Sequence, residues 1–263
     1  GYNQFMARQE RNIRVEAVVL RHSDWGEADR LLGLYTREEG KLRAIVKGAR
    51  KMRSRKAGHL EPFTRVQLML ARGRDLWIVT QVETVDAYLP LREDLQRIAQ
   101  ASYVIELLDR FTYEEGQNRL VYTLLVDTLA RLAEGDDFFL AVRYYELQLL
   151  DLLGFRPELV NCVKCGELIK PLDQFYSALL GGALCPACGP RENSARPISM
   201  PALKYLRHFQ RSTFKEAARA QVPAEIRQEV EAVIQYFLTY HLERGLNSPA
   251  FIREVRRMSA KQP

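Results

Sequence analysis

The chain contains four cysteines, and their spacing is typical of a metal site. They form two C-x-x-C pairs separated by 19 residues, Cys162 with Cys165 and Cys185 with Cys188. Two intervening residues bring both sulfurs of a pair to one side of a tight turn, so two pairs can surround one ion. Four thiolates fill the tetrahedron that Zn²⁺ prefers and leave no position for water. We therefore predict one zinc ion per chain, with a structural rather than a catalytic role.

The residues around the cysteines agree with this prediction. Gly166 and Gly189 each follow a pair and permit close approach of the backbone. The segment 158–198 has few large apolar residues, so we expect its order to depend on the ion. The alternative, two disulfides, is rare in a reducing cytoplasm. Because neither a secretion signal nor an apolar stretch of roughly 20 residues occurs, the sequence predicts a soluble cytoplasmic protein without membrane association.

The second chemical feature is a concentration of positive charge. Residues 1–86 carry 17 basic and 11 acidic residues, whereas residues 87–263 carry 22 of each, so the net charge of +6 belongs to the first third. The stretch Gly40–Leu60 contains no acidic residue and eight basic ones, namely Lys41, Arg43, Lys47, Arg50, Lys51, Arg53, Arg55 and Lys56. Eight like charges without a compensating acid favour a polyanion-binding surface over a solvated face, and we predict that they bind the backbone of a nucleic acid.

Aromatic side chains near such a surface can stack on nucleic-acid bases. The candidates are Trp25, Tyr35, Phe63 and Trp77. Tyr35 and Phe63 are flanked by apolar residues and are predicted to lie in the core. Trp25 follows Ser23 and Asp24 in a polar turn, so we predict that it is exposed and contributes to the nucleic-acid site.

Catalytic motifs are absent from the sequence. There is no phosphate loop ending in Gly-Lys-Ser/Thr, no Gly-x-Ser-x-Gly and no His-Glu-x-x-His, and the four histidines have no paired spacing. We therefore predict a protein that is not an enzyme.

The elements that position these residues follow from the hydrophobic periodicity. A period of two predicts five short strands, at 13–19, 31–36, 42–46, 63–71 and 76–85. A period of three to four predicts helices at 98–111, 120–132, 138–152, 201–211, 224–242 and 249–258. Because closure removes exposed strand edges, we expect the strands to form a small barrel.

The predicted fold class is mixed, with an N-terminal five-stranded OB-fold barrel followed by an all-α domain that carries an inserted four-cysteine zinc segment. The predicted domains are the barrel at 13–87 and the helical domain at 88–263, with the zinc segment at 158–198. Residues 1–12 are predicted to be an N-terminal arm, in which Gly1 to Phe5 before Met6 are expected to be the remnant of an expression tag.

Several short motifs occur in order along the chain. They are GEADRLL from Gly26, YTREEGK from Tyr35, VKGAR from Val46, HLEPF from His59, LLDLLGFRP from Leu149 and NSPAF from Asn247. Together with the two cysteine pairs, this order resembles the bacterial RecO recombination mediators from about Ile13 to Phe251.

The resemblance implies an OB barrel and a zinc-bearing helical domain in a non-catalytic, nucleoid-associated DNA repair protein of the RecFOR pathway. It implies binding to single- and double-stranded DNA and annealing of complementary strands. It also implies association with RecR and with the acidic C-terminal tail of single-stranded DNA-binding protein, and help in loading RecA.

Two other functional classes are alternatives to a DNA-binding mediator. A zinc-containing RNA-binding module with an OB-fold would show similar features, because barrels with basic loops also bind RNA. A nuclease would need a cluster of carboxylates for divalent metal, and the basic stretch has none.

Overall fold

The computed structural model describes residues 12–51, 56–114 and 116–246. The predicted helix at 249–258 and the arm before Asn12 lie outside the described residues. The chain folds into two compact units that divide between Glu134 and Gly135, so the first helices belong to the same unit as the barrel. The division at residue 87, which follows the change from strands to helices, remains a prediction.

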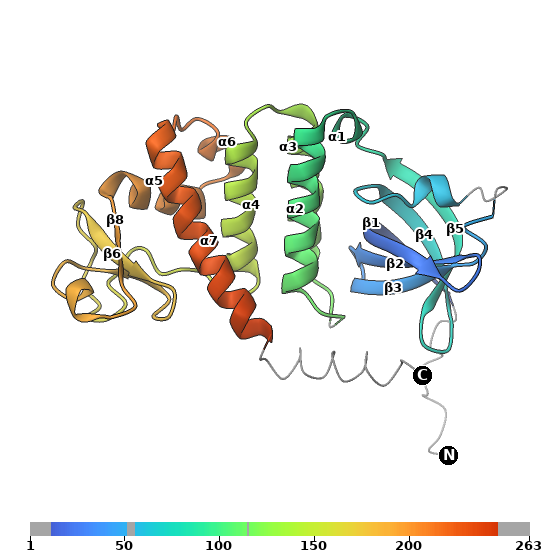
Figure 1. Cartoon of the computed structure of the whole chain (residues 1–263), viewed down its shortest axis with the longest axis horizontal. Helices are drawn as coiled ribbons and strands as arrows, with labels where there is room; N and C mark the ends of the chain where they lie inside the picture. The colour runs from blue at the N-terminus through green and yellow to red at the C-terminus, as the bar shows by residue number, and fades with distance from the viewer. Residues whose placement is uncertain (1–11, 52–55, 115, 247–263) are drawn as a thin grey trace, which may run out of the picture. The chain divides into compact units, whose positions relative to one another are not determined.

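The first unit contains the predicted closed barrel (Figure 1). Its strands are β1 (Asn12–Trp25), β2 (Asp29–Thr36), β3 (Gly40–Val46), β4 (Arg65–Arg72) and β5 (Trp77–Asp86), and a 3-10 turn, η1 (Ala57–His59), precedes β4. The strand order is β1-β2-β3-β5-β4, in which β3 and β5 pair in parallel and the other neighbours are antiparallel. The barrel is therefore confirmed.

The inner side chains of the strands form the barrel core. They alternate along each strand, as the period of two predicts, and include Val15, Ala17, Val19, Leu32, Leu34, Ala44, Val46, Val66, Leu68 and Leu70. Tyr35 and Phe63 are 3% and 8% exposed, which confirms that they are buried. Strand β1 is longer than the predicted segment 13–19, because the polar residues up to Trp25 also pair with β2 after an irregularity in register between Val19 and Arg21.

Three helices follow the barrel in the same unit, α1 (Pro90–Glu93), α2 (Leu95–Phe111) and α3 (Arg119–Glu134). Asp94 begins α2 by accepting hydrogen bonds from the backbone of Gln96 and Arg97. Helix α3 is tied to the barrel through Glu16 of β1, which is 7% exposed. Tyr122 Oη and Arg65 Nε donate to Glu16 Oε1 over 2.8 and 2.6 Å.

The second unit combines helices with a small sheet. The helices are α4 (Phe138–Leu152), α5 (Met200–Arg211), α6 (Phe214–Ala217) and α7 (Ala224–Leu246). Between α4 and α5 lie β6 (Gln174–Ser177), β7 (Gly182–Leu184), the 3-10 turn η2 (Gly189–Arg191) and β8 (Arg196–Ile198), in the sheet order β7-β6-β8. Among the described residues, no helix is long and apolar enough to cross a membrane.

Candidate metal centre and nucleic-acid interface

The four cysteines converge in the segment between α4 and α5. Their Sγ atoms all lie within 4.8 Å of one another, and those of Cys165 and Cys185 are 3.9 Å apart. Zinc–sulfur bonds of about 2.3 Å in a tetrahedron put two sulfurs about 3.8 Å apart. The four cysteines are free thiols rather than disulfides, so the cluster can bind a metal ion.

Two turns and the small sheet hold the cysteines in place. The amide of Gly166 donates to the carbonyl of Cys162 over 2.9 Å, and Gly166 has a φ of +79°, which favours glycine. Gly189 closes the second turn by donating to Cys185. A Cβ on Gly189 would lie 2.3 Å from the ring of Phe175, so a β6 side chain packs directly on this backbone. The predicted close approach is therefore found at Gly189 and not at Gly166, where a Cβ would meet no atom within 4 Å and the positive φ is what favours glycine.

The thiol pKa values indicate that the cluster suits a cation. Burial opposes ionisation of Cys162, but backbone amides of Cys165, Cys185 and Lys164 lower its pKa to about 6. Hydrogen bonding with Cys185, together with desolvation, raises the pKa of Cys188 to about 12. The four thiols therefore do not ionise equally readily on their own, and a cation bound among them would supply the charge that opposes their mutual repulsion.

The segment 158–198 contains more buried apolar residues than its composition led us to expect. Five of its large side chains are at most 5% exposed, namely Leu159, Ile169, Tyr176, Leu184 and Ile198. They come from loops and from strands of only three or four residues, which have no periodicity long enough to detect in the sequence.

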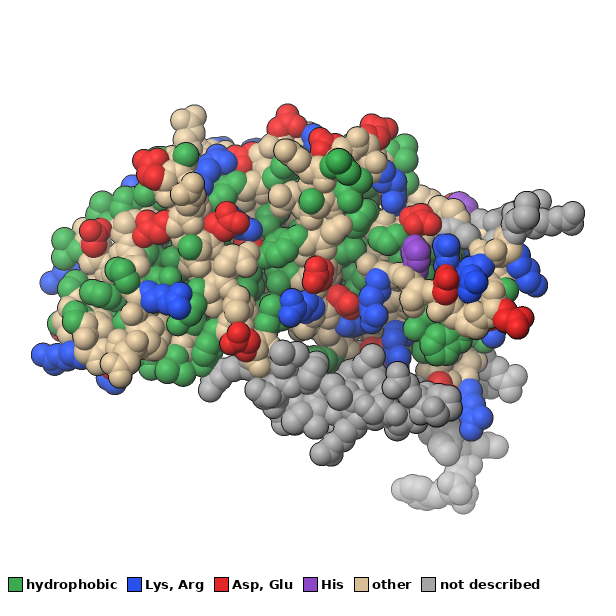
Figure 2. All heavy atoms as spheres, viewed as in Figure 1, with side chains coloured by type: hydrophobic (Ala, Val, Ile, Leu, Met, Phe, Trp, Pro, Cys, Tyr) green, Lys and Arg blue, Asp and Glu red, His purple; other side chains and the backbone are tan. Residues whose placement is uncertain are grey.

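The described basic residues predicted to bind nucleic acid lie in two different environments. Figure 2 shows basic and acidic side chains next to each other on the surface of the barrel. The first environment is the outer side of β2 and β3. There Lys41 and Arg43 have side chains that are only 12% and 16% exposed. Lys41 Nζ lies 2.7 Å from Asp109 Oδ1, and Arg43 Nε lies 2.5 Å from Glu114 Oε1. Both cations are therefore already paired within the first unit.

The second environment is one end of the barrel, where the β1–β2 turn meets the chain that leaves β3. The amide of Arg50 donates to the carbonyl of Ala28 over 2.9 Å, and its guanidinium donates to the carbonyl of Gly26 over 3.0 Å. These bonds bring Arg50 beside the turn that carries Trp25. We call the surface that carries Trp25, Lys47, Arg50, Lys51 and Lys56 the rim surface.

The side chains of Trp25, Lys47 and Arg50 are more accessible than those of Lys41 and Arg43. Trp25 is 46% exposed, as predicted for a surface residue, and the side chains of Lys47 and Arg50 are 63% and 35% exposed. Lys51 is exposed, and Lys56 donates to the carbonyl of Val79 over 3.4 Å. Arg53 and Arg55 lie outside the described residues. Trp77 packs against the barrel core, with Arg72 over its ring.

The stretch Gly40–Leu60 contains no acidic residue, but acidic residues from other parts of the chain lie beside its basic side chains. Lys47 Nζ lies 3.5 Å from Asp29 Oδ2, and Arg50 Nε lies 3.7 Å from Asp24 Oδ1. The Gly48 amide is the main cause that lowers the pKa of Asp29, with nearby Lys47 adding to it. The premise of eight uncompensated cations is thus wrong, because carboxylates from other segments pair with four of them.

Part of this pairing could have been predicted from the sequence, because Asp24 and Asp29 flank the β1–β2 turn. Asp109 and Glu114 could not have been found in this way, because they follow their partners by 68 and 71 residues. Among the described residues, no carboxylate lies within ion-pair distance of Lys51 or Lys56.

The fold and the site define a class of protein, an OB-like barrel joined to a helical region that carries a four-cysteine metal cluster. Family models described as Recombination protein O N terminal and Recombination protein O C terminal match residues 8–88 and 92–250.

Individual relatives agree with these matches. The DNA repair protein RecO of Roseiflexus sp. (strain RS-1) is 42% identical over 250 residues, which cover 95% of this chain and 88% of that protein. The DNA repair protein RecO of Pelotomaculum thermopropionicum is 40% identical over 240 residues, covering 91% of this chain and 93% of that protein. The chain therefore belongs to the RecO family of DNA repair proteins.

Proposed function

We propose that this chain is a recombination mediator that binds single- and double-stranded DNA and anneals complementary strands. The rim surface carries the proposal, because it places an exposed Trp25 beside the cations Lys47, Arg50 and Lys51. Cations neutralise phosphates, and an aromatic face stacks on bases regardless of sequence. Annealing needs no covalent step, since neutralised strands can approach each other and base pairing then drives the reaction. The protein thus acts without catalysis.

Further parts of the proposal come from the family. The chain works with RecR to load RecA onto strands coated with single-stranded DNA-binding protein, whose C-terminal tail it binds. Such work takes place on chromosomal DNA, at the bacterial nucleoid.

Annealing of complementary oligonucleotides coated with single-stranded DNA-binding protein tests this function. We expect the chain to accelerate annealing, and to do so less when the coating protein lacks its tail. Equal annealing rates with and without the chain would refute the proposal. RNA of the same sequence serves as competitor, and preferential displacement of DNA by RNA would favour an RNA-binding module instead.

We further propose that Cys162, Cys165, Cys185 and Cys188 bind one structural Zn²⁺ per chain. The support is the donor set, four sulfurs at separations that fit a tetrahedral thiolate site. When bound, the ion supplies the positive charge that keeps all four thiolates ionised and joins the two turns. Elemental analysis of protein purified without chelator should give about one zinc per chain, and metal-free folded protein would contradict the assignment.

A further inference from the structure

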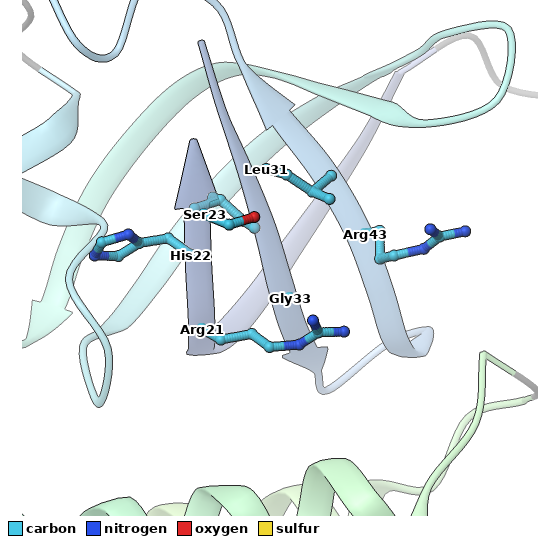
Figure 3. A pocket seen from close by; sticks show the side chains of 7 residues that line it. Arg21, His22, Ser23, Leu31, Gly33 and Arg43 are labelled. Carbon is cyan, nitrogen blue, oxygen red and sulfur yellow. The ribbon is translucent and has the colours of Figure 1, made fainter. Parts of the chain in front are cut away.

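The outer side of β2 and β3 carries basic side chains of the kind that bind nucleic acid, although acidic side chains of the same unit already pair with them. Figure 3 shows Arg21 extending from β1 past Gly33 of β2, with Arg43 projecting from neighbouring β3. A Cβ on Gly33 would lie 2.9 Å from Arg21 Cγ, so the glycine leaves the space in which this arginine lies. We call the surface formed by Arg21, Lys41 and Arg43 around Gly33 the strand face.

The groups that occupy the strand face are two carboxylates from the same compact unit. Asp109, near the end of α2, lies 3.2 Å from Arg21 Nε and 2.7 Å from Lys41 Nζ. Glu114 lies beyond the end of α2 and binds Arg43. Three cations of the barrel are thus held by two acidic side chains.

OB folds generally bind oligonucleotides on the face of strands 2 and 3 and on the adjoining loops. Arginine and lysine bind carboxylates and phosphates through the same charge-assisted hydrogen bonds. Asp109 and Glu114 therefore take the positions that two phosphates of a bound strand would take. Resting on the DNA-binding function proposed above, we propose that the strand face is a second site for the backbone of single-stranded DNA, masked by Asp109 and Glu114.

The ion pair between Arg21 and Asp109 is the part of this contact that a DNA strand can displace first, because Lys41, Arg43 and Glu114 are more buried. The side chain of Arg21 is 55% exposed, and that of Asp109 is 22% exposed. Ion pairs with such access to water are weak and are screened by salt. A strand that replaces them also releases counterions, which favours binding at low salt.

The chain after α2 sits directly on the β2–β3 turn. A Cβ on Gly40 would lie 2.2 Å from the carbonyl oxygen of Gly116, and Gly116 itself has a φ of +76°. Lys41 Nζ also donates to the carbonyls of Asp109 and Thr112. Unmasking therefore requires Asp109, Thr112 and Gly116 to give up these contacts with β3.

The test removes the two charges and keeps the shapes, with Asp109→Asn and Glu114→Gln in one variant. We expect tighter binding of a fluorescent deoxythymidine oligonucleotide, by about tenfold or more at low salt, and a slope of log affinity against log salt that is steeper by about 2. Adding Lys41→Gln and Arg43→Gln to this variant should abolish the gain.

The matched control is Asp127→Asn with Glu134→Gln, which makes the same change of net charge at exposed carboxylates of α3. An equal gain in the control, or no gain in the test variant, would overturn the proposal. If the double variant does not fold, each single substitution is measured, and each should give a smaller gain than the pair. Absence of DNA binding by the unaltered chain would instead refute the proposed function.

Discussion

The strand face and the rim surface are built from the same residue types on the same barrel, and their surroundings differ. On the strand face, Lys41 and Arg43 are largely buried against Asp109 and Glu114. On the rim surface, Lys47 and Lys51 are exposed beside Trp25. Lys47 also has a carboxylate partner, Asp29, but its side chain stays 63% exposed. A basic residue can therefore hold the fold together or stay open to a ligand, depending on how far its pairing buries it.

The largest effect is expected at Glu16, a largely buried carboxylate of the barrel that pairs with two arginines. Glu16→Gln leaves Arg65 without its charged partner and leaves Arg37 with Glu38 alone, so we expect a loss of roughly 3–5 kcal/mol in the free energy of unfolding. Denaturant unfolding measures this loss, and Glu83→Gln at an exposed position of β5 is the control. A loss no larger than that of the control would contradict the role of Glu16.

The pH dependence of that loss sharpens the test. Burial opposes ionisation of Glu16, but hydrogen bonds from Tyr122 and Arg65 hold its pKa below the usual value. A lowered pKa in the folded state stabilises the protein above the ordinary value of about 4.3, and this contribution disappears as the pH falls through the lowered pKa. The difference between the two proteins should therefore be constant near neutral pH and vanish in acid.

The next largest effect concerns the rim surface. Replacing Lys47, Arg50 and Lys51 with glutamine removes three phosphate contacts, so we expect binding of single-stranded DNA to weaken about 100-fold near 0.1 M salt. The salt slope should fall by about 2. The control replaces Arg14, Arg74 and Arg119, which are exposed elsewhere in the first unit. Equal weakening in both variants would mean that net charge, rather than the rim surface, determines affinity.

A smaller effect is expected at Trp25. Trp25→Ala removes the aromatic face but no charge, so we expect a loss of about 1–3 kcal/mol of binding free energy and an unchanged salt slope. Fluorescence anisotropy at several salt concentrations separates the two quantities. Trp25→Phe should restore most of the affinity, and a slope that changes with Trp25→Ala would argue against stacking.

The smallest effect on DNA binding is expected on the masked strand face. In the otherwise unaltered chain, Lys41→Gln with Arg43→Gln should change DNA affinity by no more than about twofold, because both side chains are paired and largely buried. The same variant should lose stability, since hydrogen bonds to charged groups contribute about 1.5–3 kcal/mol each. A large loss of DNA affinity without a loss of stability would mean that the strand face, rather than the rim surface, binds DNA in the unaltered chain.

The sequence predicted the features that depend on local spacing. The barrel strands follow from alternation and turn glycines, and the metal cluster follows from two C-x-x-C pairs. The short strands β6 to β8 escaped prediction because three or four residues carry no detectable period. Helix α1 escaped for the same reason, being a single turn from Pro90 to Glu93.

The sequence could not predict which cations would be buried by their pairing. Lys41 and Arg43 resemble Lys47 and Arg50 in type and spacing, and their partners come from the end of α2 and beyond it. Such pairing depends on how a helix packs against the barrel, which local patterns do not encode.

Photo-crosslinking of the full chain to an oligonucleotide that carries 5-iododeoxyuridine, followed by peptide mass spectrometry, tests the DNA-binding account most directly. We predict crosslinks at Trp25 and in the peptide spanning residues 47–56, with loss of the Trp25 crosslink in Trp25→Ala. Crosslinks confined to residues 135–246, with none at the rim surface, would contradict it.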